Sequence, residues 1–322
     1  MTQPTPNGRQ AQQYEDALKV TRMYYHLGLT TTEIAKQLGV TRPTVSRLLS
    51  WARANGLIEF KIHDHGAARL ALERELEQRY NLREVKIVPV PPDDPIDQQI
   101  EAVALFTANF LSSIIGSGSV LAVAWGATVS QIATHLTPRP VPGMSVVQLT
   151  GSGNNNSGYG VTDATRTIAQ FARNWHGRGH LLPIPAYFDN PATKEAMYDE
   201  RVVRRVKDLA QRADIALFSI GVPDANSYIY RAGYVEDFEL QTLRQDGVVG
   251  DIATVFFRKD GTYRDIAMNE RSTGPDLASL RNHPYSICVV AGKNKINALR
   301  GALTGGFMNT LIVDEGTALN LT

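Results

Sequence analysis

The sequence is poor in cysteine. Its 322 residues contain only Cys288, so the chain can form no internal disulfide and offers no cysteine-based metal site. Cys288 lies in the apolar segment SICVVAG, and we expect it to be buried in the core. The histidines are scattered, at positions 135, 176, 180 and 283 among others, so we expect no bound metal.

Long apolar runs are missing as well. No stretch approaches the roughly 20 residues that a membrane-spanning helix needs, and the polar N-terminus lacks a signal-peptide pattern. We therefore expect a cytoplasmic protein without a membrane partner. The net charge of +1 excludes a polycation, yet residues 1–65 carry eight Lys and Arg against five Asp and Glu. A mildly basic N-terminal part suits contact with DNA phosphates.

The motifs of several common enzyme classes are absent. The sequence contains neither the dinucleotide-binding pattern GxGxxG nor the phosphate-binding loop GxxxxGK[ST]. No Ser/His/Asp order typical of a hydrolase stands out. We therefore expect no cofactor and assign no catalytic residue.

The stretch TTTEIAKQLGVTRPTVSRLLSWARANG predicts two short helices joined by a tight turn. Thr30 and Glu33 have the spacing of a capping box, which marks a helix start. Gly39 ends that helix, because glycine enters the left-handed conformation cheaply. Thr41 can cap the second helix.

The second helix of this pair has two distinct sides. Val45, Leu48, Leu49 and Ala52 fall on one side at about 100° per residue. This is the pattern of a helix-turn-helix, whose second helix enters the DNA major groove. The candidate DNA contacts lie at the helix start and on the opposite side: Thr41, Arg42, Pro43, Thr44, Ser46, Arg47 and Ser50. The alternative is a plain helical hairpin with a solvated polar face.

Composition divides the chain into four predicted segments. Residues 1–13 form a disordered tail, and residues 14–65 form the DNA-binding domain, with a first helix from Tyr14 and a short strand or wing in LIEFKI. Residues 66–84 form a linker helix, and residues 85–322 form a larger body.

The linker helix has an apolar stripe. Ala68, Leu72, Leu76 and Tyr80 lie close to one line on its surface. The stripe can pack on its own body or pair with a second copy of the chain. Because helix-turn-helix proteins usually read two-fold operators as dimers, we favour a role in assembly and expect a dimer or tetramer.

Apolar segments alternate with amphipathic ones from residue 85 onward. The predicted strands are VKIVPV, VLAVAW, SVVQLTG, HLLPIPA, DIALFSIG, TVFFRKDG, YSICVVAG and NTLIVDEG, and the predicted helices cover 98–115, 128–136, 163–175, 193–213, 236–245 and 295–303. Such alternation predicts an α/β fold with a mainly parallel sheet covered on both sides.

Ligands of open parallel sheets bind where the strands end and the helices begin. Residues 125–128 (WGAT) and 150–154 (TGSGN) each follow a predicted strand, and the backbone of such loops attracts anions at a helix start. Two such loops indicate a phosphorylated or polyhydroxy ligand, although tight turns alone would also explain the glycines. Lys295 opens a helix after a strand, where it reaches a ligand or stays solvated. Asp251 follows a glycine turn, where it accepts sugar hydroxyls or simply caps the turn.

Taken together, the segments TVSRLL, GLIEFKI, WGATV, VVQLTG, LPIPA, DIALFSIG, GVVGDI and LIVDEGTA resemble the SorC family of bacterial sugar-responsive transcriptional regulators. The resemblance spans nearly the whole chain from about residue 14. It implies a Rossmann-like effector domain with the fold shared by glucosamine-6-phosphate deaminase and ribose-5-phosphate isomerase. It also implies that residues 85–322 bind sugars and form the oligomer, typically a tetramer.

The family motifs imply effector contacts at Gly126, Ala127, Thr128, Gly151, Ser152, Asp251 and Lys295, and the position of the second loop adds Gly153 as a candidate. Two motifs depart from the family pattern. The family motif AGGxxK begins with Ala291, Gly292 and Lys293 in this chain, so the motif is one residue short before Lys295. Thr150 stands just before the second glycine loop, where some relatives have lysine or arginine. The resemblance thus implies an effector with one phosphate or none.

We therefore expect a DNA-binding transcriptional regulator of carbohydrate metabolism whose operator affinity is controlled by a sugar or sugar phosphate. One alternative is an active sugar-phosphate isomerase or deaminase with a DNA-binding head and Asp251 as general base. Another is a scaffold with a vestigial pocket.

Overall fold

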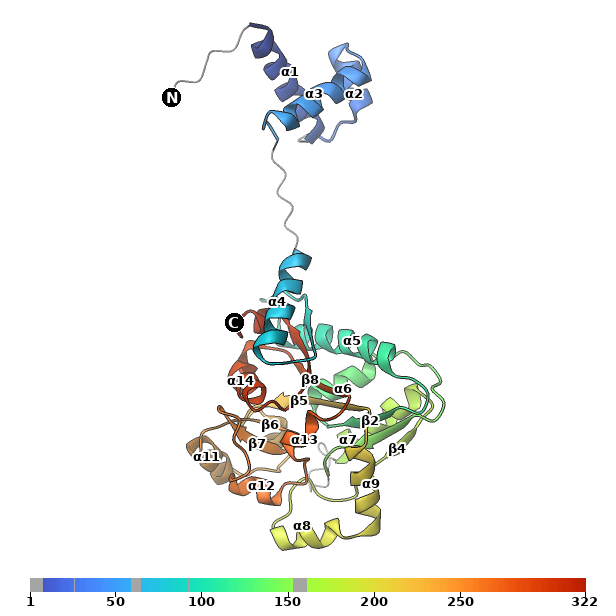
Figure 1. The fold of residues 1–322 in the computed structure, drawn as a ribbon, viewed down its shortest axis with the longest axis vertical. Coiled ribbons are helices and arrows are strands. Elements are labelled where there is room, and N and C mark those ends of the chain that lie inside the picture. Colours follow the sequence, from blue (N-terminus) through green and yellow to red (C-terminus); the bar gives the residue numbers. More distant parts are fainter. Residues whose placement is uncertain (1–7, 26, 59–64, 92, 153–160) are drawn as a thin grey trace. The chain divides into compact units, whose positions relative to one another are not determined.

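The computed structural model describes residues 8–25, 27–58, 65–91, 93–152 and 161–322. Contacts divide the chain into two compact units, Met1–His65, hereafter the head, and Gly66–Thr322, hereafter the body (Figure 1). Within the described residues, none of the helices combines the length and the apolar character needed to cross a membrane.

The head consists of three helices, α1 (Gly8–Tyr25), α2 (Thr31–Leu38) and α3 (Arg42–Ala54). They enclose a small core built from Val20, Met23, Ile34, Ala35, Val45 and Leu49. Helix α1 starts at Gly8, so the expected boundary at Tyr14 is corrected: residues 8–13 are helical. Of the wing predicted at residues 57–62, only Leu57 and Ile58 belong to the described residues.

The turn between α2 and α3 follows the predicted chemistry. Thr30 and Glu33 form the reciprocal capping box, and Gly39 ends α2 with a φ of 65°. Thr41 occupies the N-cap position of α3, but its hydroxyl does not cap the backbone there. Instead it lies 2.9 Å from the Thr44 hydroxyl, which corrects the capping role expected of Thr41.

The body is organised around a parallel sheet. Its strands lie in the order β1-β9-β8-β5-β2-β3-β4, and all neighbouring pairs in this path are parallel. The strands are β1 (Glu84–Val88), β2 (Val120–Val123), β3 (Ser145–Gln148), β4 (Arg178–His180), β5 (Ile215–Gly221), β8 (Tyr285–Val290) and β9 (Thr310–Asp314). The expected parallel sheet is confirmed.

Helices cover both faces of the sheet, as predicted. Each face of the sheet has its own hydrophobic core. Strand side chains alternate between the faces, so Leu217 packs into the first core and Phe218 into the second. The first core is covered by α5 (Ile96–Ile114), α6 (Ala127–Thr134) and α7 (Val161–Asn174). The second core is covered by α4 (His65–Arg79), α9 (Arg201–Gln211), α13 (Leu277–Leu280), α14 (Ile296–Thr304) and α15 (Glu315–Ala318), and it contains Cys288, which is fully buried.

Helix α4 packs on its own body. Leu76 is fully buried, and Leu72 and Tyr80 pack against the same core. Figure 1 shows α4 beside the C-terminal end of the chain, and the Tyr80 hydroxyl donates to the Leu321 carbonyl at 3.2 Å. Three of the four stripe residues thus pack on the body, which is the other role that the sequence left open for them, and Ala68 is exposed.

Carboxylates of α4 also close the edge of the sheet. The Val85 N–H of β1 donates to Glu77 at 2.9 Å, and the Ile87 N–H donates to Glu73 at 2.8 Å. β1 lies at the end of the strand order, where free N–H groups would otherwise attract another strand. The two glutamates of α4 thus supply hydrogen-bond acceptors for these N–H groups of the edge strand β1.

A hairpin of β6 (Val248–Ile252) and β7 (Val255–Arg258) extends the sheet in antiparallel fashion from the end of β5. With α10 (Tyr228–Arg231), α11 (Asp237–Gln245) and α12 (Ala267–Arg271) it encloses a third apolar cluster (Figure 1). The segment GVVGDI is therefore largely strand β6, and the glycine turn that we expected before Asp251 lies at Gly247, whose φ is 74°. A second turn follows the strand at Ala253 and Thr254, whose φ angles are 48° and 72°.

Two further predictions are corrected. The segment HLLPIPA forms no strand beyond His180, where β4 ends, because Pro183 and Pro185 have no N–H to donate to a ladder. The single helix expected at 193–213 is two helices, α8 (Pro191–Tyr198) and α9. They separate because α8 contacts α12 whereas α9 packs on β2 and β3.

Candidate functional site

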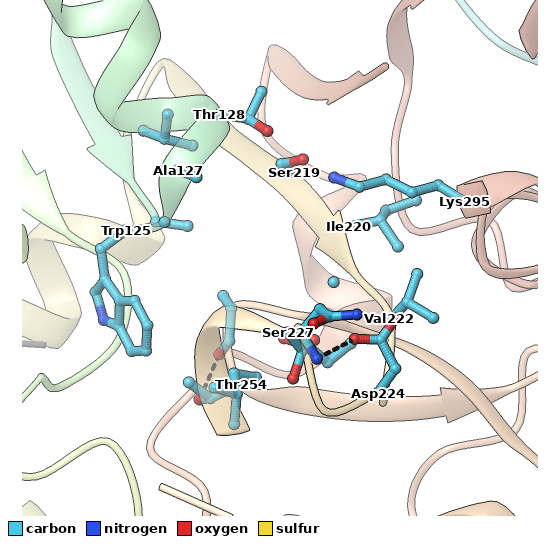
Figure 2. A pocket seen from close by; sticks show the side chains of 18 of the residues that line it. Trp125, Ala127, Thr128, Ser219, Ile220, Val222, Asp224, Ser227, Thr254 and Lys295 are labelled. Carbon is cyan, nitrogen blue, oxygen red and sulfur yellow. Dashed lines mark hydrogen bonds between the residues drawn. The ribbon is translucent and has the colours of Figure 1, made fainter. Parts of the chain in front are cut away.

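A cavity of about 240 Å³ opens at the carboxyl ends of β2 and β5. Its walls are the start of α6, the end of β5, the β6–β7 turn, the segment leading into α10, and the short helix η1 (Lys293–Lys295). In Figure 2 the Lys295 side chain extends toward the end of the cavity where Thr128 and Ser219 lie. Parallel sheets place ligand sites at this edge, and the cavity lies where the sequence predicted one.

The first part of the wall is the start of α6. Gly126 precedes the helix with a φ of 139°, a conformation that L side chains rarely adopt, and no side chain caps the helix there. The first N–H groups of the helix have no partner within the helix, and the helix dipole favours an anion at this end. Ala127 and Thr128 line the cavity, and Thr128 is only 5% exposed. The structure thus brings Gly126, Ala127 and Thr128 together around an anion-attracting helix start.

Asp251 and Lys295 bring opposite charges to the cavity. Burial raises the pKa of the Asp251 carboxyl to about 7, although the Thr254 backbone and the Lys295 charge act in the other direction. Burial also lowers the pKa of the Lys295 amine, and Cys288 and Asp251 oppose that shift. Both charged forms are therefore disfavoured in the empty cavity, and a polar ligand gains from contact with either group.

Gly221 makes room for the Asp251 carboxylate. A Cβ atom on Gly221 would lie 2.0 Å from Asp251 Oδ1, a distance that no side chain could keep. The two residues face each other because Gly221 pairs with Asp251 across β5 and β6. The sequence alone did not connect them.

The described part of the second predicted loop, residues 150–152, lies beside this cavity and does not line it. The Gly151 carbonyl accepts a hydrogen bond from Trp125 Nε1 at 2.9 Å, and the Ser152 carbonyl accepts one from the Tyr234 hydroxyl at 2.7 Å. A Cβ atom on Gly151 would lie 2.3 Å from the Ile184 carbonyl oxygen. The lack of a side chain at Gly151 therefore allows the two backbone segments to pack closely. Gly153 lies outside the described residues.

Sequence reasoning missed several polar residues of the wall, namely Ser219, Asp224, Asn226, Ser227 and Thr254. The Ser219 Oγ is buried and has no hydrogen-bond partner in the described part of the chain. Asp224 Oδ1 accepts from the Asn226 N–H at 2.8 Å (Figure 2). Ser219 and Asp224 both lie at the carboxyl end of the predicted strand DIALFSIG, and that position was the available signal.

The β6–β7 turn is held in place by buried hydroxyls. Thr254 is β-branched and has a positive φ, which costs conformational energy. Its hydroxyl lies 3.0 Å from the Thr150 hydroxyl and 2.9 Å from the Ser272 hydroxyl, and the Thr150 hydroxyl lies 3.3 Å from the Thr273 hydroxyl. This hydroxyl cluster fixes the turn on the cavity wall. Thr150 takes part as a structural residue.

The candidate DNA-binding face of α3 is open to solvent. Thr41, Arg42, Pro43, Ser46, Arg47 and Ser50 are exposed, and Thr44 is half-buried. The opposite side is closed by Val45, Leu49 and Ala52, all buried. Arg47 Nε makes only a long contact of 3.4 Å with the Pro43 carbonyl, so its guanidinium is available for another partner.

A helix-turn-helix head joined to a parallel-sheet body with a ligand-sized cavity defines the class of DNA-binding transcriptional regulators that carry a sugar-binding domain. Residues 10–78 match the Crp-like helix-turn-helix domain, and residues 64–322 match Sugar-bind, a sugar-binding domain family. The chain belongs to the SorC family of these regulators.

Individual relatives agree with this assignment. The deoxyribonucleoside regulator of Bacillus subtilis is 34% identical over 304 residues, which cover 94% of this chain and 95% of that protein. The crystal structure of the full-length sorbitol operon regulator SorC from Klebsiella pneumoniae is 27% identical, with a TM-score of 0.70, and the match covers 97% of this chain and all of that one. A domain of "a possible sugar-binding transcriptional regulator" from Arthrobacter aurescens is 38% identical, with a TM-score of 0.74, over 81% of this chain and 99% of that one.

Proposed function

We propose that this protein regulates genes of carbohydrate metabolism by binding operator DNA through α3, and that a sugar or sugar phosphate in the body cavity sets its operator affinity. The observation that carries the proposal is the cavity itself: an uncapped helix start, a lysine and a buried carboxylate meet at the carboxyl edge of the sheet. Helix N–H groups and lysine suit a phosphate, and Asp251 suits sugar hydroxyls.

The proposal contains no catalytic step. The curated relatives named above are regulators, and the protein would act in the cytoplasm beside its DNA. A single head presents one recognition helix, so we also propose that two or four chains assemble to read a two-fold operator.

The effector site is tested by replacing one hydroxyl and one amine. Thr128→Val keeps the shape of the side chain and should weaken effector binding by about tenfold, the value of one hydrogen bond to a charged group. Lys295→Ala should weaken binding of a phosphorylated ligand by about 10- to 100-fold and that of a neutral sugar by much less. The measurement is the ligand-induced shift in melting temperature across pentose and hexose phosphates and their free sugars.

Each of these variants has a matched control. Thr134→Val makes the same change at the exposed far end of α6, and Lys293→Ala removes an exposed lysine from η1. Neither control should alter the shift. Equal stabilisation of the wild type and all four variants by a bound ligand would show that the effector binds elsewhere. Consumption of the ligand at a catalytic rate would favour the isomerase or deaminase alternative.

A further inference from the structure

A second cavity, of about 440 Å³, lies between the end of β3, α9 and the segment around α13. Its polar and aromatic lining includes Gln148, Tyr198, Lys207, Asp276 and His283. It shares no lining residue with the cavity at the start of α6. The proposed effector site therefore does not account for its chemistry.

Gln148 lies on the lining of this cavity and carries an unused amide donor. Its side chain is 1% exposed, and its Oε1 accepts a hydrogen bond from the Leu182 N–H at 3.1 Å. That bond fixes the orientation of the amide and leaves Nε2 buried without a partner among the described residues. A buried amide donor without an acceptor costs about 1–3 kcal/mol, so an acceptor in the cavity would relieve a real penalty.

Lys207 adds a positive charge to the same wall. The residue is half-buried, and its Nζ lies 2.9 Å from the centre of the Tyr198 ring. Burial lowers the pKa of its amine to about 8, which leaves it mostly protonated at pH 7. Within the described residues Lys207 has no ion pair and no hydrogen bond.

The other ionisable groups nearby already have partners. Asp276 accepts from the Tyr263 hydroxyl and lies 3.5 Å from Arg264, and the Glu195 carboxylate lies 3.8 Å from Lys194. His283 Nδ1 lies 2.9 Å from the Ala213 carbonyl, which can only accept a hydrogen bond. Among the charged side chains of this lining, Lys207 is therefore the one without an ion pair in the described part of the chain, and Gln148 adds an amide donor.

The rest of the wall is largely apolar. Leu149, Leu182 and Ala210 are at most 7% exposed, and Pro275 lies beside them on the lining. A free phosphate would satisfy the donors but leave these surfaces in contact with water. A carboxylate with an apolar body would suit both parts of the wall. Its two oxygens match the two donors, and its carbon chain covers the apolar side chains.

We propose that this second cavity binds a small organic carboxylate, held by Lys207 and by Gln148 Nε2, with its apolar part against Leu149 and Leu182. The ligand class differs from that of the effector cavity, and the site does not depend on the proposed regulatory function. The body would then bind two classes of small molecule at two separate sites.

The test is a ligand-observed NMR titration of the full-length protein with acetate, butyrate, hexanoate and benzoate, and with hexanol and inorganic phosphate as comparisons. We expect saturable binding of hexanoate or benzoate and at least tenfold weaker binding of hexanol and phosphate. Lys207→Met keeps the length of the side chain and should weaken carboxylate binding by at least tenfold. Gln148→Glu keeps the acceptor for Leu182 but removes the donor, and it should weaken binding as well.

Lys259→Met is the charge-matched control, because Lys259 directly follows β7, is exposed and lines neither cavity. It should bind carboxylates as the wild type does. Absence of saturable binding for all four carboxylates would overturn the proposal. Equal affinity of the wild type and Lys207→Met would overturn it too, even if Gln148→Glu failed to fold.

Discussion

Arg47→Ala is expected to lower operator affinity by about 10- to 100-fold per head, because one side-chain contact to a base pair is worth roughly 1–3 kcal/mol. Arg47 is exposed on the outer face of α3, opposite the buried Val45 and Leu49. Two heads on a two-fold site would multiply the loss. The measurement is the dissociation constant at fixed salt for a DNA site selected from random sequence with the wild-type protein.

Arg22→Ala provides the control for this experiment. It removes the same charge from an exposed position on α1, which packs against the inner side of α3 through Val20 and Met23. We expect the control to reduce affinity little, and both variants to keep the wild-type ligand-induced melting shift. An Arg47→Ala protein that binds the selected site as tightly as the wild type would show that this face of α3 does not read the DNA.

The second large effect concerns Asp251 and pH. Its carboxyl has a pKa of about 7 in the folded chain against 3.8 as the reference value, so the folded state holds this proton more tightly than the unfolded state does. The contribution of this bound proton to the free energy of unfolding is fully present below pH 4 and is lost as the pH rises toward 7. It amounts to about 4 kcal/mol at most.

Asp251→Asn should therefore have the same free energy of unfolding as the wild type near pH 4, because the amide mimics the protonated carboxyl. Near pH 8 the variant should be more stable than the wild type by up to about 4 kcal/mol. Chemical denaturation of both proteins at several pH values measures the difference. Bound effector should reduce it, since a ligand that donates hydroxyls to the carboxylate favours the ionised form. A difference that stays constant from pH 4 to pH 8 would contradict the burial of a titrating carboxyl at this position.

Local and periodic signals in the sequence predicted much of the fold. The capping box at Thr30 and Glu33, the left-handed Gly39 and the apolar stripe of α3 depend on neighbouring residues only, and the structure reproduces them. The parallel sheet was predictable because buried strands such as DIALFSIG are mostly apolar and show no strict alternation with polar residues. The position of the Gly126 loop on a cavity follows from the general position of ligand sites at strand ends.

The features that were missed depend on contacts between distant segments. β6 forms because Ile252 and Asp251 pair with Ile220 and Gly221, some thirty residues away, and its turn at Ala253 and Thr254 contains no glycine to signal it. The linker stripe packs inward because Leu72, Leu76 and Tyr80 meet a core built from distant strands and helices, which the helix sequence does not reveal. Ser219 became a candidate only once the strand ends were placed around one cavity.

The central claim is that the body cavity and the DNA-binding head are energetically coupled. The most direct measurement is the operator dissociation constant of the wild-type protein with and without a sugar or sugar phosphate that produces a Thr128-dependent melting shift. Coupling between two sites is typically 1–3 kcal/mol, so we predict a change of about 5- to 150-fold in operator affinity at saturating ligand. A ligand that saturates the cavity and leaves operator affinity unchanged would contradict the account.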